Sequence, residues 1–273
     1  MPMERRRFLQ MTALLGGSAA IPALAHAAPQ GLRVRHHDVA FQGAAQWHGG
    51  RLRVAQLSDI HVGWGTTAGV LAQASLAANQ AQADLLVLTG DYLNHSLAEI
   101  DNLEAWLKTL PRPCVATFGN HDHWSGVAGI RKVLEKNGII TLVNESLTLD
   151  LGGKRLCVVG VDDGFTHHDD SEKAFSNVAL PGNALVLAHE PRTADRVSRA
   201  GGRLVLSGHT HGGQVVIPGL TRALTAAIGM RYVAGWYQAG DAQLYVNAGV
   251  GASVAVARVG DQAAPELAVL DLA

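Results

Sequence analysis

Five short apolar segments of this 273-residue chain each end in a small group of polar residues rich in His, Asp, Asn and Gly. In chain order the groups are Asp59-Ile60-His61, Gly90-Asp91, Gly119-Asn120-His121-Asp122, His189-Glu190-Pro191 and Gly208-His209-Thr210-His211. Short apolar segments of this kind are typical of buried β-strands. In open α/β sheets, functional side chains gather where parallel strands end. The ordered set therefore predicts five strand ends that meet at one rim and hold one binuclear metal site.

The remainder of the chain alternates short apolar segments with helical patterns, which indicates the α/β class. Strands are predicted at Leu52–Leu57, Asp84–Thr89, Pro113–Phe118, Leu156–Val161, Ala184–Ala188, Arg203–Ser207, Leu244–Asn247 and Leu267–Leu272. Helices are predicted at Thr67–Ala81, Leu97–Leu110 and Ser125–Asn137. This alternation calls for βαβ units and a largely parallel first sheet. The later part of the chain has more strands than helices, so we expect a second, mixed sheet packed on the first within one domain.

Composition argues against two broad classes of protein. With 48% apolar residues the chain can bury a large core, so extended disorder is not expected. The formal net charge is −1, and no run of Lys or Arg lies beyond residue 7. A nucleic-acid-binding protein normally carries a basic patch or stripe. Nucleic acid is therefore not the expected partner.

Residues 1–27 have the composition of an export signal rather than that of a folded domain. Arg5-Arg6-Arg7-Phe8-Leu9 precedes an apolar stretch over residues 11–25 and the small-residue pattern Ala23-Leu24-Ala25. The arginine order resembles the signal that the bacterial twin-arginine translocation machinery reads. The stretch is shorter than the ~20 residues that span a bilayer, so an export signal is favoured over a permanent anchor. We expect residues 28–273 to form one domain in the periplasm or another extracytoplasmic compartment, free or attached to the membrane.

The ligand types in the five groups favour a catalytic metal site over a structural one. They offer imidazole, carboxylate and amide groups but no thiolate, a set that suits Mn, Fe, Zn or Ni. Asn120 would supply only a weak, neutral amide oxygen. A catalytic site binds its ion with moderate affinity and keeps one coordination position open, whereas a structural site gains little from such a weak ligand.

The five groups, in this order, resemble the motifs D-x-H, G-D, G-N-H-D/E, H and G-H-x-H of the calcineurin-like metallophosphoesterase superfamily. The resemblance extends over residues 51–272. The segment from Gly208 to Gln214, followed by Pro218, is most similar to an exported or membrane-associated bacterial branch that includes the YkuE and YaeI phosphoesterases. The resemblance implies an α/β fold with four layers, an αββα sandwich of two mixed sheets flanked by helices. It also implies a metal site at the carboxyl ends of the strands.

The resemblance further implies a role for each motif residue. One divalent ion would be held by Asp59, His61 and His211, the other by Asn120, His189 and His209, and both by Asp91. His121 would remain outside the ligand set and would protonate the leaving oxygen, or stabilise the transition state, while a metal-activated water attacks phosphorus. The two ions would be Mn, Fe or Zn, with Mn favoured.

Substrate class stays open at the level of sequence. A phosphodiester or a phosphomonoester, either of them small or lipid-linked, fits the motifs, with a UDP-sugar-lipid type pyrophosphatase and a non-catalytic exported metal-binding scaffold as alternatives. In protein Ser/Thr phosphatases an Asp and an Arg follow the bridging Asp, where this chain has Asn94 and His95. Asn94 lacks the negative charge of that Asp, and His95 lacks the bidentate donor group of that Arg. A phosphoprotein substrate is therefore not expected.

Three further regions have two interpretations each. Asp162-Asp163 together with His167-His168-Asp169-Asp170 form a substrate-side cluster or ordinary polar loops, and His123 is at most a candidate for the wall of the site. Arg192 contacts phosphate or begins a helix in solvent. The apolar segment over residues 215–237 is a lip for a lipid-linked substrate or ordinary core, which periodicity cannot separate.

Overall fold

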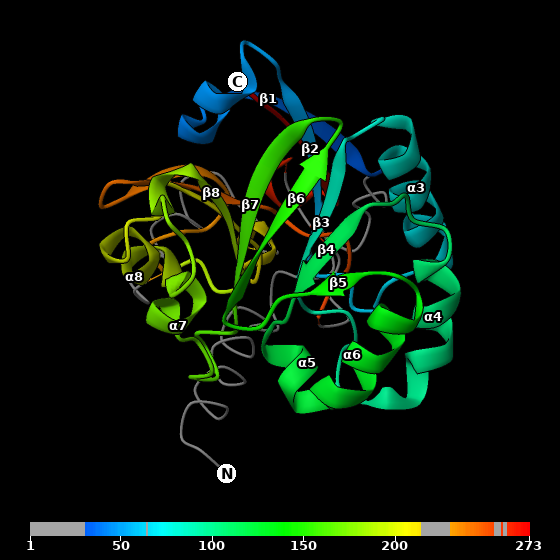
Figure 1. Ribbon diagram of the computed structural model, residues 1–273. Helices are drawn as coiled ribbons and strands as arrows, with labels where there is room; N and C mark the ends of the chain where they lie inside the picture. Colours follow the sequence, from blue (N-terminus) through cyan, green and yellow to red (C-terminus); the bar gives the residue numbers. More distant parts are fainter. Residues whose placement is uncertain (1–30, 64, 214–229, 254–257, 259–260) are drawn as a thin grey trace.

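Two six-stranded β-sheets form the centre of the structure (Figure 1). The structure is a computed structural model that describes residues 31–63, 65–213, 230–253, 258 and 261–273. The first sheet has the order β1 (Arg33–Val39), β12 (Glu266–Leu272), β2 (Leu52–Leu57), β3 (Leu85–Thr89), β4 (Cys114–Thr117) and β5 (Ile140–Thr141). The second has the order β10 (Gly235–Ala239), β11 (Ala242–Val246), β9 (Leu204–Ser207), β8 (Ala184–Ala188), β7 (Lys154–Val161) and β6 (Glu145–Leu151).

The predicted mixture of parallel and antiparallel pairing is confirmed. In the first sheet only the β12–β2 pair is antiparallel. In the second sheet β6–β7 and β10–β11 are antiparallel, and the pairs between β7, β8, β9 and β11 are parallel. The four strands that the sequence did not reveal, β1, β5, β6 and β10, are the four sheet edges. Much of each edge strand alternates between exposed and covered residues, so it lacks the continuous apolar run that identified the central strands.

Helices cover the outer face of each sheet, which gives the four layers that the resemblance implied (Figure 1). The first sheet carries α3 (Ala68–Gln80), α4 (Ile100–Leu107) and α6 (Val127–Lys136), and the second carries α7 (Ser171–Phe175) and α8 (Thr193–Arg199). A short helix, α5 (Asn120–Ser125), directly follows β4. Short 3₁₀ helices lie at η1 (Gln42–Trp47), η2 (Leu97–Glu99), η3 (Pro181–Asn183), η4 (His211–Gly213) and η5 (Asp261–Ala263).

Three apolar clusters hold these layers together. The largest joins the first sheet to its helices, a second fills the space between the two sheets, and a third joins the second sheet to α7 and α8. Strands such as β3 and β8 are buried along their whole length because both of their faces are covered. Within the described ranges, no helix combines the length and the apolar character that crossing a bilayer requires.

The loops that leave the two sheets meet at one rim. Asp59 and His61 donate backbone N–H groups to the carbonyls of Gly90 (3.0 Å) and Asp91 (3.0 Å), which joins the β2 and β3 loops. The backbone N–H of His209, after β9 in the second sheet, donates to the Asp59 carboxylate at 3.0 and 3.1 Å. Loops from both sheets are therefore fixed against each other where the polar groups lie.

Candidate metal centre

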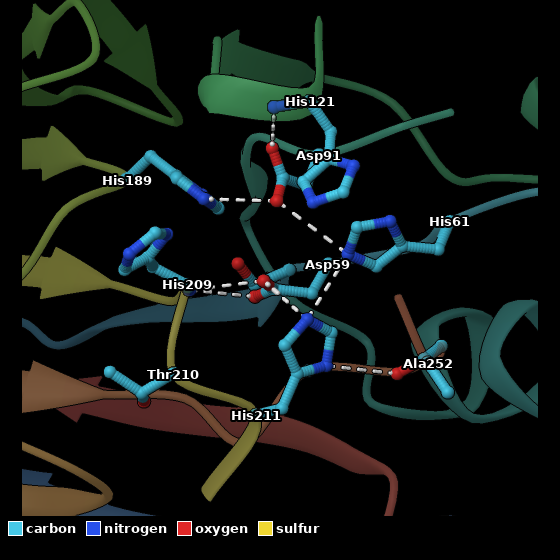
Figure 2. A network of polar contacts seen from close by, with 12 residues as sticks. Asp59, His61, Asp91, His121, His189, His209, Thr210, His211 and Ala252 are labelled. Atoms are coloured by element: carbon cyan, nitrogen blue, oxygen red, sulfur yellow. Dashed lines mark hydrogen bonds and ion pairs between the residues drawn. The ribbon is translucent and has the colours of Figure 1, made fainter. Parts of the chain in front are cut away.

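The structure brings the eight residues singled out by the sequence to this rim, and Figure 2 labels all of them except Asn120. Asp59 and His61 follow β2, Asp91 follows β3, Asn120 and His121 open α5, His189 follows β8, and His209 and His211 follow β9. All are buried except His209, which is partly exposed. The predicted convergence of five strand ends is therefore confirmed.

Asp59, His61 and His211 form one half of the cluster. The Nε2 atoms of His61 and His211 lie 3.1 Å apart, and the His211 Nε2 atom lies 3.4 Å from Asp59 Oδ1. The Nδ1 atom of His211 faces the carbonyl of Gly251 at 3.1 Å. In the tautomer that donates this Nδ1 proton, the lone pair of Nε2 points into the cluster, as a metal ligand requires.

His189, His209 and Asn120 form the other half, and Asp91 lies between the two halves. Asp91 Oδ2 is 3.2 Å from His189 Nε2 and 3.5 Å from His61 Nε2. The amide oxygen of Asn120 lies 2.8 Å from His209 Nδ1. Among the described residues, Asp91 is the carboxylate that groups both with His61 and with His189 and His209, which is the position that a shared ligand would need.

The hydrogen bonding of His189 shows that a divalent cation fits this site. Its Nδ1 atom faces the Thr89 carbonyl at 2.7 Å, so the neutral ring donates there and keeps a lone pair on Nε2. His189 Nε2 is buried and finds no hydrogen-bond partner among the described residues, although the Asp91 carboxylate is close. A lone pair beside a carboxylate is unfavourable without a proton or a cation between them. A cation held by His189 and Asp91 would satisfy both atoms.

Charges within the cluster shift the pKa values of its members. Burial would lower the pKa of His189, but the carboxylate of Asp91 outweighs it and raises that pKa well above its usual value. Burial would likewise raise the pKa of Asp91, but His189 and His121 hold it well below its usual value. Burial lowers the pKa values of His61 and His211 well below the usual range. Neutral imidazoles and an ionised carboxylate are the forms that bind metals, so His61, His211 and Asp91 already have these forms, whereas a bound cation would replace a proton on His189.

A comparison with known families identifies the protein class. A model of the family "Calcineurin-like phosphoesterase" matches residues 52–213, which include all five motifs. The chain belongs to the calcineurin-like phosphoesterase family. It is a phosphoester hydrolase whose clustered histidines and carboxylates are candidate metal ligands.

Three relatives illustrate the range of this phosphoesterase family. The metallophosphoesterase YkuE of Bacillus subtilis (strain 168) is 31% identical over 73% of this chain and 72% of its own length. The phosphodiesterase YaeI of Escherichia coli (strain K12) is 29% identical over 91% and 93%, respectively. The UDP-2,3-diacylglucosamine pyrophosphatase LpxG of Chlamydia muridarum (strain MoPn / Nigg) is 27% identical over 64% and 67%.

Left-handed backbone conformations are concentrated at the metal centre of the phosphoesterase. Among the described residues other than glycine, positive φ angles occur at Asp59 (51°), His61 (47°), Asp91 (60°), His209 (74°) and His211 (51°), and at four residues elsewhere. Each such conformation costs roughly 1–3 kcal/mol. The surrounding loops maintain this strain because it turns five side chains toward one point.

Two glycines allow the strand ends to approach each other closely. A Cβ atom at Gly119 would lie 2.3 Å from Asp91 Oδ1 and 2.7 Å from the His189 ring. A Cβ atom at Gly208 would lie 1.9 Å from Ser58 Oγ and 2.3 Å from Asp59 Oδ2. The absence of a Cβ atom at these two positions therefore lets the ligand groups crowd together at the strand ends.

We expect Gly119→Ala to displace Asp91 and His189, with about a 10²-fold loss of kcat/KM and weaker Mn²⁺ binding. The matched control is Gly69→Ala on α3, where a Cβ meets only Thr67 Oγ1 at 3.8 Å. This control should leave metal binding unchanged and stabilise the helix by up to ~1 kcal/mol. Calorimetric Mn²⁺ titration, steady-state kinetics and urea unfolding measure these effects. Wild-type metal affinity in Gly119→Ala would contradict the crowding argument.

Asp122 supports the loops rather than the chemistry. Its carboxylate accepts hydrogen bonds from the backbone N–H groups of Asp91 (2.8 Å), Tyr92 (2.8 Å) and Gly119 (2.9 Å). Burial and the charge of Asp91 raise the pKa of Asp122 to about 7. Both oxygens are occupied, so Asp122 fixes the β3 loop against α5 and is no partner for the His121 ring.

We expect Asp122→Asn to lower the free energy of unfolding by about 2–3 kcal/mol, because an amide nitrogen would face buried backbone donors. The control is Asp170→Asn, whose carboxylate accepts one bond from the Lys173 N–H at the exposed start of α7. Asparagine caps a helix about as well as aspartate, so this change should be nearly neutral. Urea unfolding of the metal-free protein compares the two. Equal effects of both changes would count against the supporting role of Asp122.

The His121 ring is oriented by a backbone group. Its Nδ1 atom contacts the carbonyl oxygen of Asn94, and its own backbone N–H donates to Asp91 Oδ1 at 2.9 Å. A ring nitrogen of His121 lies within 4.8 Å of ligand atoms of His61 and Asp91. Asn94 thus orients His121 through its main chain.

Arg258 is a residue of the site that the sequence did not reveal. Its Nη1 atom donates to the carbonyls of Ala248 (2.7 Å) and Ala263 (3.0 Å). Its Nη2 atom contacts the carbonyl of Gly251 and lies 2.9 Å from His211 Nδ1. Burial lowers the pKa of Arg258 to about 10, so the guanidinium is still charged at neutral pH. No motif marked it, because it lies 47 residues beyond His211 in the chain.

The remaining candidate groups have mainly structural contacts. Arg192 bonds Glu190 at 3.1 Å through Nε. Asp163 is buried, and its Oδ2 atom accepts from the N–H and hydroxyl of Thr166, both at 2.7 Å. Of the apolar segment over residues 215–237, which was interpreted as a lip or as ordinary core, residues 215–229 lie outside the described residues. Tyr232, farther along this segment, packs in the outer core of the second sheet.

Proposed function

We propose that this protein is an exported two-metal phosphoesterase that hydrolyses a phosphodiester or a phosphomonoester. Asp59, His61 and His211 hold one ion, Asn120, His189 and His209 hold the other, and Asp91 is shared. The observation that carries the proposal is the buried Nε2 atom of His189, which has no hydrogen-bond partner among the described residues and lies 3.2 Å from Asp91. The two ions are Mn, Fe or Zn, and Mn²⁺ is favoured for the carboxylate and amide oxygens of the set, while the imidazoles also suit Fe or Zn.

The chemistry is divided between the ions and the protein. Two divalent cations supply Lewis-acid activation of water and stabilise charge on the phosphoryl oxygens when they are bound. In this proposal His121 stays outside the ligand set, and the contact of its Nδ1 atom with the Asn94 carbonyl orients the ring. The opposite ring nitrogen is then available to deliver a proton to the leaving oxygen. Asp91 also fixes the start of α5 by accepting the His121 N–H.

The relatives suggest two substrate classes. YaeI is a phosphodiesterase, and its match extends over 91% of this chain, which favours a diester. LpxG is a UDP-2,3-diacylglucosamine pyrophosphatase, which makes pyrophosphate cleavage on a lipid-linked substrate the second candidate. A metal-binding scaffold without turnover is the third. The scaffold would not require the oriented His121 ring.

Hydrolysis assays on Mn²⁺-loaded protein separate these functions. We expect turnover of bis(p-nitrophenyl) phosphate, slower turnover of p-nitrophenyl phosphate, and a preference for Mn²⁺ over Zn²⁺ or Fe²⁺ in a parallel screen. A UDP-linked diacyl sugar as the preferred substrate would favour the pyrophosphatase. Full metal occupancy with no turnover of any diester, monoester or pyrophosphate would leave the scaffold function.

We further propose that residues 1–27 direct twin-arginine export and that residues 28–273 work as one domain in the periplasm, with or without contact to the membrane surface. The arginines at positions 5 and 6 and the apolar stretch behind them support this location. Fusing residues 1–35 to a reporter tests it. Export should require Arg5 and Arg6. Export that survives Lys at both positions would contradict a twin-arginine route.

A further inference from the structure

Two aromatic side chains stand beside the metal centre on different segments. Trp124, on α5, contacts the ring of His121 with centroids 4.8 Å apart. Phe165, between β7 and α7, contacts the ring of His209 with centroids 5.1 Å apart. The two aromatic rings meet edge to face at 6.1 Å. Together they form a continuous aromatic surface, which we call the Trp124–Phe165 wall, from the His121 side of the centre to the His209 side.

The wall is held in place by contacts behind it. His123 bonds Asp162 at 2.9 Å, and its ring stacks on His168 with centroids 3.9 Å apart and an angle of 9°. Asn144 donates to the His168 carbonyl at 2.8 Å and accepts from the Asp162 N–H at 3.0 Å. These contacts fasten α5 to the loop after β7. The positions of the two rings relative to the metal centre are therefore fixed.

Exposure and charge at the wall indicate what it would bind. Trp124 and Phe165 are partly exposed, whereas the adjacent His121 is buried. Two arginines near the rim, Arg192 and Arg196, pair with Glu190 and Asp169. A group beside a bound phosphate would thus meet aromatic faces and edges. Such surfaces favour a flat aromatic partner over an alkyl group of the same size.

We propose that Trp124 and Phe165 form a subsite for a planar aromatic ester group of the substrate, either an aryl group or a nucleobase. The location of the phosphate in this arrangement rests on the proposed function. The two rings would contact the group attached to phosphorus while the phosphoryl oxygens face the metal centre. Specificity would then be set by the loop after β7 and by α5, whose Trp124 lies outside the metal-binding motifs.

The test uses non-hydrolysable phosphonates and measures binding instead of turnover. Phenylphosphonate and cyclohexylphosphonate have the same charge and nearly the same size, but only the first is flat and aromatic. Calorimetric titration of the Mn²⁺-loaded full-length protein should show phenylphosphonate binding roughly two- to tenfold more tightly. The phosphonate analogues of adenosine monophosphate and ribose 5-phosphate form a second pair. A larger preference in this second pair would identify a nucleobase rather than a simple aryl group.

Substitutions assign the preference to the wall. Trp124→Leu and Phe165→Leu should each reduce the phenyl-to-cyclohexyl ratio to near one, whereas Trp124→Phe should retain part of it. Trp236→Leu is the control, because Trp236 is an exposed tryptophan on β10, outside the metal centre. Metal content and urea unfolding measured on each variant show that the centre is intact.

The outcomes separate this proposal from the proposed function. Equal binding of the two phosphonates by the wild type would overturn the subsite, as would a ratio unchanged in both leucine variants. In the latter case the rings only shield His121 and His209. A protein that prefers phenylphosphonate but hydrolyses no ester would retain the subsite and lose the proposed activity. A protein that hydrolyses esters but does not prefer phenylphosphonate would retain the proposed activity and lose the subsite.

Discussion

Asp91→Asn is expected to remove metal from both halves of the centre and to lower kcat/KM roughly 10³-fold or more. Asp91 Oδ2 lies 3.2 Å from His189 Nε2 and 3.5 Å from His61 Nε2, and no other carboxylate of the cluster is placed between the two groups. A metal ion contributes several kcal/mol of transition-state stabilisation, and each 1.36 kcal/mol is a factor of ten in rate. Metal analysis of the purified variant, together with steady-state kinetics, measures both effects.

A second aspartate provides the control for this change. Asp150 accepts one backbone bond from Gly153 in the turn between β6 and β7, outside the centre. Asp150→Asn should keep the metal content and the rate of the wild type. Two retained ions in Asp91→Asn would show that Asp91 is not the shared ligand.

His121→Ala is expected to lower kcat/KM by about 10²–10⁴-fold, the usual contribution of a general acid, while the metal content stays unchanged. The ring is oriented by the Asn94 carbonyl rather than by a carboxylate. His36→Ala, at an exposed position on β1, is the control and should leave the rate unchanged. Metal content that falls together with activity in His121→Ala would place His121 among the ligands, since its ring also lies near Asp91 and His61.

The sequence predicted the part of the fold that depends on continuous apolar strands. β3 and β8 are buried on both faces, so their apolar runs were visible and the polar groups behind them marked the rim. β1 and β10 are sheet edges whose residues alternate between exposed and covered. They are strands because they pair with β12 and β11. The partner of β1 is β12, near the other end of the chain, which local patterns do not report, whereas β10 pairs with the neighbouring β11 across a short turn.

The sequence predicted those site residues whose side-chain chemistry is itself typical of metal ligands. His189 and Asp91 were found because imidazole and carboxylate groups followed strands. The orientation of His121 depends on a main-chain carbonyl, which is the same in every residue type and leaves no mark in the sequence. Arg258 contacts His211 and Phe165 contacts His209 because of the paths that their loops follow, which the sequence does not reveal.

Metal stoichiometry tests the central claim most directly. Metal-free protein is titrated with Mn²⁺, and bound metal per chain is measured beside the rate of phosphodiester hydrolysis. The two-ion centre predicts saturation at two ions per chain, with most of the activity appearing as the second site fills. Full activity at one ion per chain, or two bound ions with no hydrolysis of any phosphoester, would contradict it.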